Sequence, residues 1–236
     1  MNAQTQSKID ELIDWIRSTT DVANGRGVVI PVSGGSDSAL CFWLCAKALP
    51  RERVLAVFIG KELRCREWFE RQGNVRFIPE LGHDENIKHV ELQRWAIMLS
   101  QSLECRGWLV GTRNRTEELL GTYSLASRLA TYLPLFGLWK SEVMDLAAAV
   151  GVPMEIIESS QRADPSCGRP KQMADIPFGI VDLFLKVRQG EQPESSLQEL
   201  PNATLDYLQS IYDRNQFKAH LPLCGPIPTR RDNDNL

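Results

Sequence analysis

The chain has 236 residues and a formal net charge of -3, with 43% hydrophobic and 24% charged residues. These values fit one soluble globular domain with a sizeable core, and they argue against an extended nucleic-acid-binding surface. The chain opens without an apolar signal core, and no stretch approaches the length of a membrane span. We therefore expect a cytoplasmic protein without a membrane or nucleic-acid partner.

In the first half of the chain, short apolar segments alternate with helical patterns. Pro31 stands near the end of the first apolar segment, where a strand does not need its N–H. Strands that alternate with helices predict βαβ units and a parallel sheet. The predicted helices cover residues 7–18, 37–49 and 85–104, and the predicted strands cover 28–32, 53–59, 74–78 and 107–112.

The second half is predicted to be mainly helical. A helix over 140–151 ends at a glycine with Pro153 just beyond it, which is a common helix stop. Residues 159–175 are polar and broken by prolines, which indicates a loop, and a helix resumes over 204–220. We expect one domain over residues 1–225, an α/β fold with a doubly wound parallel sheet and a helical C-terminal part, followed by a flexible tail over 226–236.

The segment VVIPVSGGSDS at residues 28–38 places a glycine-rich turn between a predicted strand and a predicted helix. Unpaired N–H groups and the helix dipole make this position suitable for an anion, and Gly34 and Gly35 allow the backbone to approach a ligand closely. No lysine follows the glycines, so the segment is not a Walker A loop. The alternative is a simple helix start capped by Ser33 or Ser36.

SGGSDS after an apolar strand resembles the pyrophosphate-binding loop (PP-loop) of the N-type ATP pyrophosphatases. Two later segments, GTRNRTEELLG at 111–121 and LPLFGLWKSEVMDLAAAVGVPMEII at 133–157, resemble NAD synthases within that superfamily. The three segments occur in family order, and the similarity covers about residues 10–225. The resemblance implies an adenine nucleotide alpha hydrolase-like fold and a ligase that adenylates a carboxylate, releases pyrophosphate and forms an amide.

The resemblance also implies ATP and Mg²⁺ as ligands and assigns roles to individual residues. Asp37 would face Mg²⁺, Glu117 would be its second protein ligand, Thr112 would contact the nucleotide and Lys140 would reach the phosphates. Asp37 and Lys140 are then the candidate catalytic residues. Read locally, Lys140 is also compatible with a solvated charge, and Glu117 with a partner of the helix dipole. The expected ATP-binding residues are Ser33, Gly34, Gly35, Ser36, Asp37, Ser38, Thr112 and Lys140.

The acceptor half of the family pattern is altered. NAD synthases carry acidic residues before their Pro-Leu motif, whereas residues 123–134 here contain no acid and include Arg128. The later loop at 159–165 lacks the lysine and the hydroxyl of the family pattern. We therefore hypothesise that the small-molecule acceptor differs from deamido-NAD, and that Arg128 contributes to its site.

Three functions stay open on the sequence alone. The first is amide formation with ammonia, either free or from a separate glutaminase, because no glutaminase segment is visible. The second is sulfur transfer, for which Cys167 is the candidate carrier because Gly168 and Arg169 beside it favour a thiolate. The third is a non-catalytic ATP-binding protein. The family resemblance further implies a homodimer.

Overall fold

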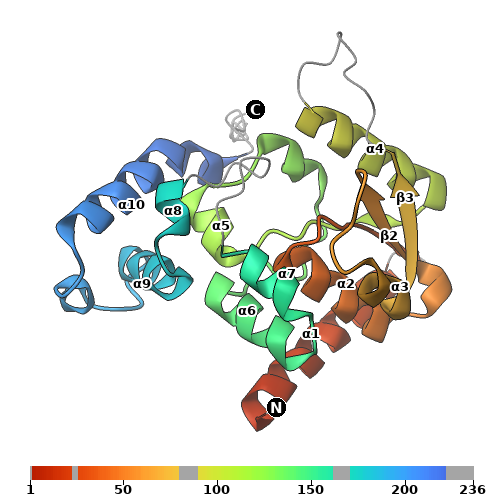
Figure 1. Ribbon diagram of the computed structural model, residues 1–236, viewed down its shortest axis with the longest axis horizontal. Helices are drawn as coiled ribbons and strands as arrows, with labels where there is room; N and C mark the ends of the chain where they lie inside the picture. The colour runs from red at the N-terminus through yellow and green to blue at the C-terminus, as the bar shows by residue number, and fades with distance from the viewer. Residues whose placement is uncertain (1, 23–25, 80–89, 162–170, 222–236) are drawn as a thin grey trace, which may run out of the picture.

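The protein is seen here as a computed structural model that describes residues 2–22, 26–79, 90–161 and 171–221 (Figure 1). The predicted tail at 226–236 lies outside these residues. The strands are β1 (Val28–Pro31), β2 (Val54–Ile59), β3 (Asn74–Ile78) and β4 (Trp108–Leu109). The helices are α1 (Ala3–Val22), α2 (Ser36–Ala48), α3 (Arg66–Gln72), α4 (Val90–Cys105), α5 (Arg115–Leu120), α6 (Lys140–Ala149), α7 (Met154–Ser159), α8 (Lys171–Ala174), α9 (Phe178–Arg188) and α10 (Asn202–Asn215).

The four described strands form a parallel sheet in the order β3-β2-β1-β4. Pro31 is the last residue of β1 and lies opposite Val57, and the next N–H, that of Val32, donates to the Val57 carbonyl at 2.9 Å. The ladder therefore loses only one donor at its end. β4 is shorter than the predicted strand at 107–112. Val110 still donates its N–H to the Val29 carbonyl at 2.9 Å, but beyond Leu109 the ladder is reduced to an isolated bridge between Val110 and Tyr132.

Alternating side chains of β1 enter two different cores. Val28 and Ile30 pack into the main core with residues of α2, while Val29 packs with Met98 of α4 on the opposite face. This alternation is the period of two expected of a strand that is buried on both sides. Helices consequently cover both faces of the sheet, and the predicted doubly wound α/β fold is confirmed (Figure 1).

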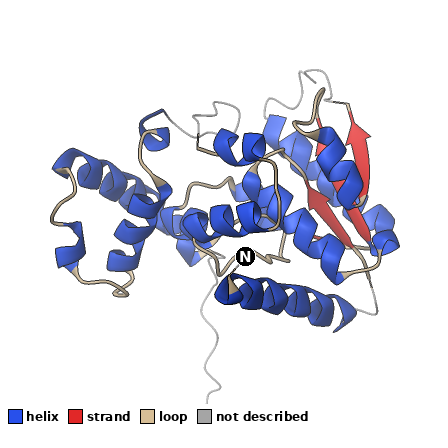
Figure 2. Ribbon diagram, turned by 60° about the horizontal axis from the view of Figure 1, so that its bottom comes forward, coloured by secondary structure: helices blue, strands red, loops and turns tan. Residues whose placement is uncertain are grey.

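The C-terminal helices build a third core of their own, in which Trp139 and Leu120 meet Phe184 of α9 and Leu208 of α10. Figure 2 shows this helical end extending away from the strands. The predicted helical C-terminal part is therefore confirmed.

Some predicted boundaries are wrong. Residues Lys171–Ala174 form α8 inside the segment predicted as a loop, and α10 ends at Asn215, after which Gln216–His220 form the 3₁₀ helix η4. α1 extends beyond the predicted 7–18 at both ends, because its polar flanking residues carry no apolar signal.

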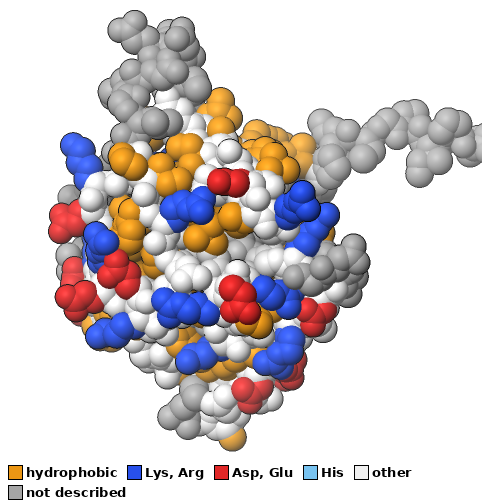
Figure 3. Space-filling model, turned by 90° about the vertical axis from the view of Figure 1, so that its right-hand side faces the viewer, with side chains coloured by type: hydrophobic (Ala, Val, Ile, Leu, Met, Phe, Trp, Pro, Cys, Tyr) orange, Lys and Arg blue, Asp and Glu red, His pale blue; other side chains and the backbone are white. Residues whose placement is uncertain are grey.

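The face of the molecule in Figure 3 carries basic and acidic side chains side by side. Ion pairs of the described residues include Arg66 with Glu70 on α3, and Arg76 of β3 with Glu104 of α4. Because charges of both signs are mixed on this face, it has no strong electrostatic potential of one sign. Over the described ranges, every helix is too short or too polar to cross a bilayer.

Candidate active site

The segment Ser33–Ser38, the PP-loop expected from the sequence, connects the carboxyl end of β1 to the first turn of α2. Gly34 has φ +80°, a backbone conformation that residues with a side chain rarely adopt, so the turn favours glycine at this position. The Ser38 hydroxyl donates to the Gly35 carbonyl at 3.0 Å and accepts from the Ser33 N–H at 3.2 Å. Gly35 is the N-cap and α2 receives no hydrogen bond from a capping side chain at that position. The simple capping interpretation of Ser33 and Ser36 is therefore wrong.

Lys140, the first residue of α6, reaches this turn from more than 100 positions away in the sequence. Its Nζ donates to Ser36 Oγ at 2.9 Å and forms an ion pair with Asp37. The Lys140 side chain is only 7% exposed, and its Nζ also lies 5.4 Å from the centre of the Phe178 ring. Lys140 is thus a buried cation aimed at the PP-loop, and the interpretation of it as a solvated charge is wrong.

Asn114 joins the two carboxyl groups of the site. Its side-chain amide donates to Asp37 Oδ1 at 2.8 Å, and its Oδ1 accepts the Glu117 N–H at 2.9 Å. Its own N–H donates to Glu117 Oε2 at 3.2 Å, which completes a capping box at the start of α5. Asn114 is fully buried. Sequence reasoning did not identify Asn114, although the capping-box spacing Asn-x-x-Glu could have indicated it.

The carboxyl group of Glu117 has a perturbed proton affinity. Burial and the negative charge of Asp37 raise its pKa from 4.5 to about 7, against the opposing effects of Lys140, the Asn114 N–H and Arg113. Within the described ranges, no three His, Cys, Asp or Glu side chains form a metal-binding group. The charge of Asp37 acts on Glu117, so the two carboxyl groups lie near each other, and a cation between them would stabilise the ionised form of Glu117.

Thr116 and Asp182 hold α6 in position, and sequence reasoning identified neither. Thr116 Oγ1 donates to Asp182 Oδ1 at 2.5 Å and accepts the Lys140 N–H at 2.8 Å. The other oxygen of Asp182 accepts the Ser141 N–H at 2.9 Å. Because a carboxylate at a helix N-terminus is favourable, this buried trio fixes the helix end that carries Lys140.

Replacing Thr116 with valine should lower the free energy of unfolding by about 2 kcal/mol, because buried Asp182 loses a donor and the Lys140 N–H loses its acceptor. Replacing Thr116 with serine keeps the hydroxyl and should cost much less. Urea unfolding midpoints of the two variants, compared at equal slope, measure the difference. Equal destabilisation by valine and serine would exclude the role of the hydroxyl.

The remaining predicted site residues lie in different places. Thr112 lies two positions before Asn114, between β4 and α5. Arg128 belongs to the 3₁₀ helix η2 (Leu125–Leu129), and its guanidinium contacts Glu118, the Tyr123 hydroxyl and the Lys218 carbonyl. These contacts do not include the PP-loop. Cys167 lies outside the described residues.

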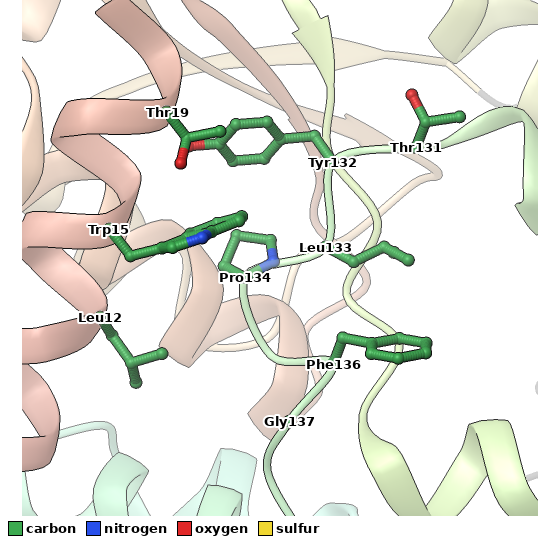
Figure 4. Close-up of a pocket in the computed structure, with 9 residues that line it drawn as sticks. All are labelled: Leu12, Trp15, Thr19, Thr131, Tyr132, Leu133, Pro134, Phe136 and Gly137. Atoms are coloured by element: carbon green, nitrogen blue, oxygen red, sulfur yellow. The ribbon is translucent and has the colours of Figure 1, made fainter.

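A pocket of about 470 Å³ lies elsewhere on the molecule, between α1 and the segment 131–137 (Figure 4). Its lining is apolar apart from a few hydroxyl groups, and Trp15 and Tyr132 form one wall with their rings 5.1 Å apart. None of the residues around Lys140 lines it. The PP-loop cluster, and not this pocket, is therefore the candidate active site.

Comparison with known proteins gives a consistent result. The family model described as NAD synthase matches residues 8–85 and 72–222. The NH₃-dependent NAD⁺ synthetase of Methanocaldococcus jannaschii is 26% identical over 246 residues, which cover 91% of this chain and 94% of that protein.

Two solved structures share the fold. One is the NH₃-dependent NAD synthetase of Campylobacter jejuni in complex with nitrate, with TM-score 0.74 and 22% identity over 96% of this chain and 100% of that one. The other is the NMN synthetase of Francisella tularensis, with TM-score 0.73 and 20% identity over 94% and 99% of the two chains.

Proposed function

The chain belongs to the NAD synthase family, and from this premise we propose that it is an ATP-dependent ligase that adenylates a carboxylate and forms an amide with ammonia. The observation that carries the proposal is the convergence of Lys140 and Asn114 on Asp37 in the first turn of α2. A buried cation, oriented amides and a helix N-terminus meet where a polyphosphate would bind.

In the proposed reaction, a carboxylate oxygen of the acceptor attacks the α-phosphorus of ATP, and the bond to the β-phosphate breaks to release pyrophosphate. Ammonia then attacks the acyl carbon, AMP leaves and one proton is lost. The residues of this chain bind and neutralise the phosphates. Lys140 Nζ, fixed by Ser36 and Asp37, supplies positive charge without reorganisation as negative charge moves onto pyrophosphate.

Asp37 and Glu117 are the residues that would hold Mg²⁺. Nucleotide-bound Mg²⁺ usually takes one or two protein carboxylates together with phosphate oxygens. Burial and the nearby charge of Asp37 raise the pKa of Glu117, and this fits a site that accepts a cation. When bound, Mg²⁺ would neutralise charge on the leaving pyrophosphate.

The first acceptor to propose is deamido-NAD, because the similar M. jannaschii protein is named an NAD⁺ synthetase that depends on ammonia. Because that name specifies ammonia, it favours a nitrogen nucleophile over a sulfur nucleophile. The hypothesis of a different acceptor rests on residues 123–134, which lack the acids of the family pattern and include Arg128, paired with Glu118 at 3.2 Å. A smaller or more acidic carboxylate, or a carbonyl, would suit this change.

The acceptor is tested by supplying purified protein with ATP, Mg²⁺ and ammonia, together with either deamido-NAD or nicotinate mononucleotide. We expect deamido-NAD to give NAD, with pyrophosphate released in equal amount. Amide formation from the mononucleotide alone would support the altered-acceptor hypothesis. If neither acid causes pyrophosphate release, both acceptor hypotheses are contradicted. Asp37→Ala serves as the blank.

We further propose that the protein acts in the cytoplasm as a homodimer, with free ammonia or ammonia from a separate glutaminase. Support comes from the family membership. Sedimentation of the purified chain at micromolar concentration tests the dimer, and a monomer that retains full activity would contradict its importance.

A further inference from the structure

Trp139 lies between the C-terminal core and the candidate active site. Its side chain is 5% exposed and belongs to the C-terminal core that includes Phe184, whereas the side chain of the next residue, Lys140, reaches the PP-loop. α6 itself packs against both α2 and α9 (Figure 1). The peptide between residues 139 and 140 therefore joins the C-terminal helices to the PP-loop cluster.

Arg115, the first residue of α5, contacts this segment twice. Its N–H donates to the Leu138 carbonyl at 2.8 Å, and its guanidinium lies over the Trp139 ring, 4.3 Å from the ring centre. Lys186 of α9 has its Nζ over the same ring, at 5.1 Å. A cation over an indole face is attracted by the negative charge of the π-system, so the ring is held from α5 and from α9.

The backbone of Trp139 is fixed as well. Its N–H donates to Glu142 Oε2 at 2.9 Å, and its carbonyl accepts the Val143 N–H at 2.9 Å, which makes Trp139 the N-cap of α6. A residue held in both backbone and side chain leaves the next residue little freedom to shift. This matters for Lys140, because a misplacement of about 1 Å in a positioned group can cost about 100-fold in rate.

We propose that Trp139 is a positioning residue, through which the C-terminal core fixes Lys140 at the PP-loop. This inference rests on the proposed function in that Lys140 acts on the phosphates. Trp139 makes no bond to the substrate, and its effect passes through Lys140. The aromatic ring carries the effect, and not apolar volume alone, because Arg115 and Lys186 are both placed over it.

The test is a double-variant cycle that combines Trp139→Leu with Lys140→Met. Trp139→Leu keeps an apolar side chain without a ring, and Trp139→Phe restores a ring. Leu208→Ala is the matched control, because Leu208 is fully buried in the same core but lies on α10. The two readouts are kcat of ATP-dependent pyrophosphate release and calorimetric affinity for Mg-pyrophosphate, which needs no turnover.

Trp139→Leu should lower kcat about ten-fold or more, the size expected for a slight misplacement of a positioned group, and should weaken Mg-pyrophosphate binding in parallel. In the Lys140→Met background, the same replacement should change either readout by less than about two-fold. Trp139→Phe should recover most of the lost kcat. Leu208→Ala should lower the thermal unfolding temperature and leave kcat near that of wild type.

Equal losses from Trp139→Leu with and without Lys140 would overturn the inference, because they would show a role that does not pass through Lys140. An equal loss of kcat in Leu208→Ala would overturn it too, since any weakening of the core would then suffice. If Trp139→Leu does not fold, Arg115→Met takes its place in the cycle, because the Arg115 side chain is 33% exposed and its backbone bond to Leu138 remains.

The binding readout separates this inference from the proposed function. Wild type that binds Mg-pyrophosphate but forms no amide would contradict the proposed function, and the cycle in binding affinity would still support or overturn the role of Trp139. Wild type that binds no Mg-pyrophosphate would contradict both.

Discussion

Replacing Lys140 with methionine should lower kcat by about 10²–10³-fold, the usual loss when one preorganised electrostatic contact to the transition state is removed. Lys140 is the buried cation nearest the PP-loop in the described structure, held between Ser36 and Asp37. Methionine keeps most of the side-chain volume, so the effect isolates the charge. The measurement is ATP-dependent pyrophosphate release at saturating substrates.

Lys47→Met is the matched control for this variant. Lys47 lies near the other end of α2 and, like Lys140, has its Nζ 5.4 Å from the centre of an aromatic ring, that of Trp43. Its side chain is exposed, and kcat of the control should stay within two-fold of wild type, roughly the scatter of neutral surface changes. Retained kcat in Lys140→Met would remove Lys140 from the proposed mechanism.

Replacing Glu117 with glutamine should stabilise the protein above pH 7 while lowering kcat about 100-fold or more. Glutamine still accepts the Asn114 N–H, so the capping box is kept. The charge is lost, however, and with it one of the two proposed Mg²⁺ ligands. Kinetics at varied Mg²⁺ and thermal unfolding at varied pH without nucleotide are the two measurements.

The sign of the stability change follows from proton binding. The pKa of Glu117 is about 7 in the folded protein against an ordinary 4.5, with burial as the main cause, so the folded state holds its proton more tightly. Wild type therefore loses stability as the pH rises from 4.5 to 7, by on the order of 1–3 kcal/mol. The advantage of Glu117→Gln should be absent below pH 4.5 and full above pH 7. An advantage independent of pH would contradict this account.

Glu142 provides the contrast, because it occupies the equivalent capping-box position in α6. Burial raises its pKa, but the hydrogen bonds from Lys8 and the Trp139 N–H, together with the charge of Lys8, outweigh burial and lower it overall. A carboxyl group whose pKa is lowered by folding stabilises the protein at pH values above its ordinary pKa, and this contribution is lost as the pH falls. Glu142→Gln should therefore be less stable than wild type at pH 8, the opposite sign to Glu117→Gln.

The sequence was sufficient for the parts of the site that lie within one continuous segment. The turn at 33–38 follows a buried strand and begins a helix, so its place at the sheet edge could be predicted from local patterns. The family resemblance pointed to Lys140 and Glu117, and the structure brings Lys140 onto the loop. The parallel sheet likewise followed from the alternation of elements.

Residues whose role depends on distant partners could not be predicted in this way. Asp182 lies in the apolar segment FGIVDLFLKVR, and only the packing of α9 against α5 and α6 gives it Thr116 and Ser141 as donors. Ser160, whose hydroxyl accepts the Ser36 N–H at 3.0 Å, stands in a polar segment rich in candidates, and nothing nearby in the sequence indicates this partner. The sequence did not predict α8, because a helix of four residues is too short to show the hydrophobic periodicity of a helix.

Adenylation of a carboxylate at the PP-loop is tested most directly by isotope transfer. The acceptor is prepared with ¹⁸O in its carboxylate and incubated with ATP, Mg²⁺, ammonia and protein, and the AMP formed is analysed by mass spectrometry. One ¹⁸O atom in each AMP is expected, because a carboxylate oxygen remains on the α-phosphorus when the amide forms. Unlabelled AMP, or ADP with inorganic phosphate, would contradict the proposed mechanism.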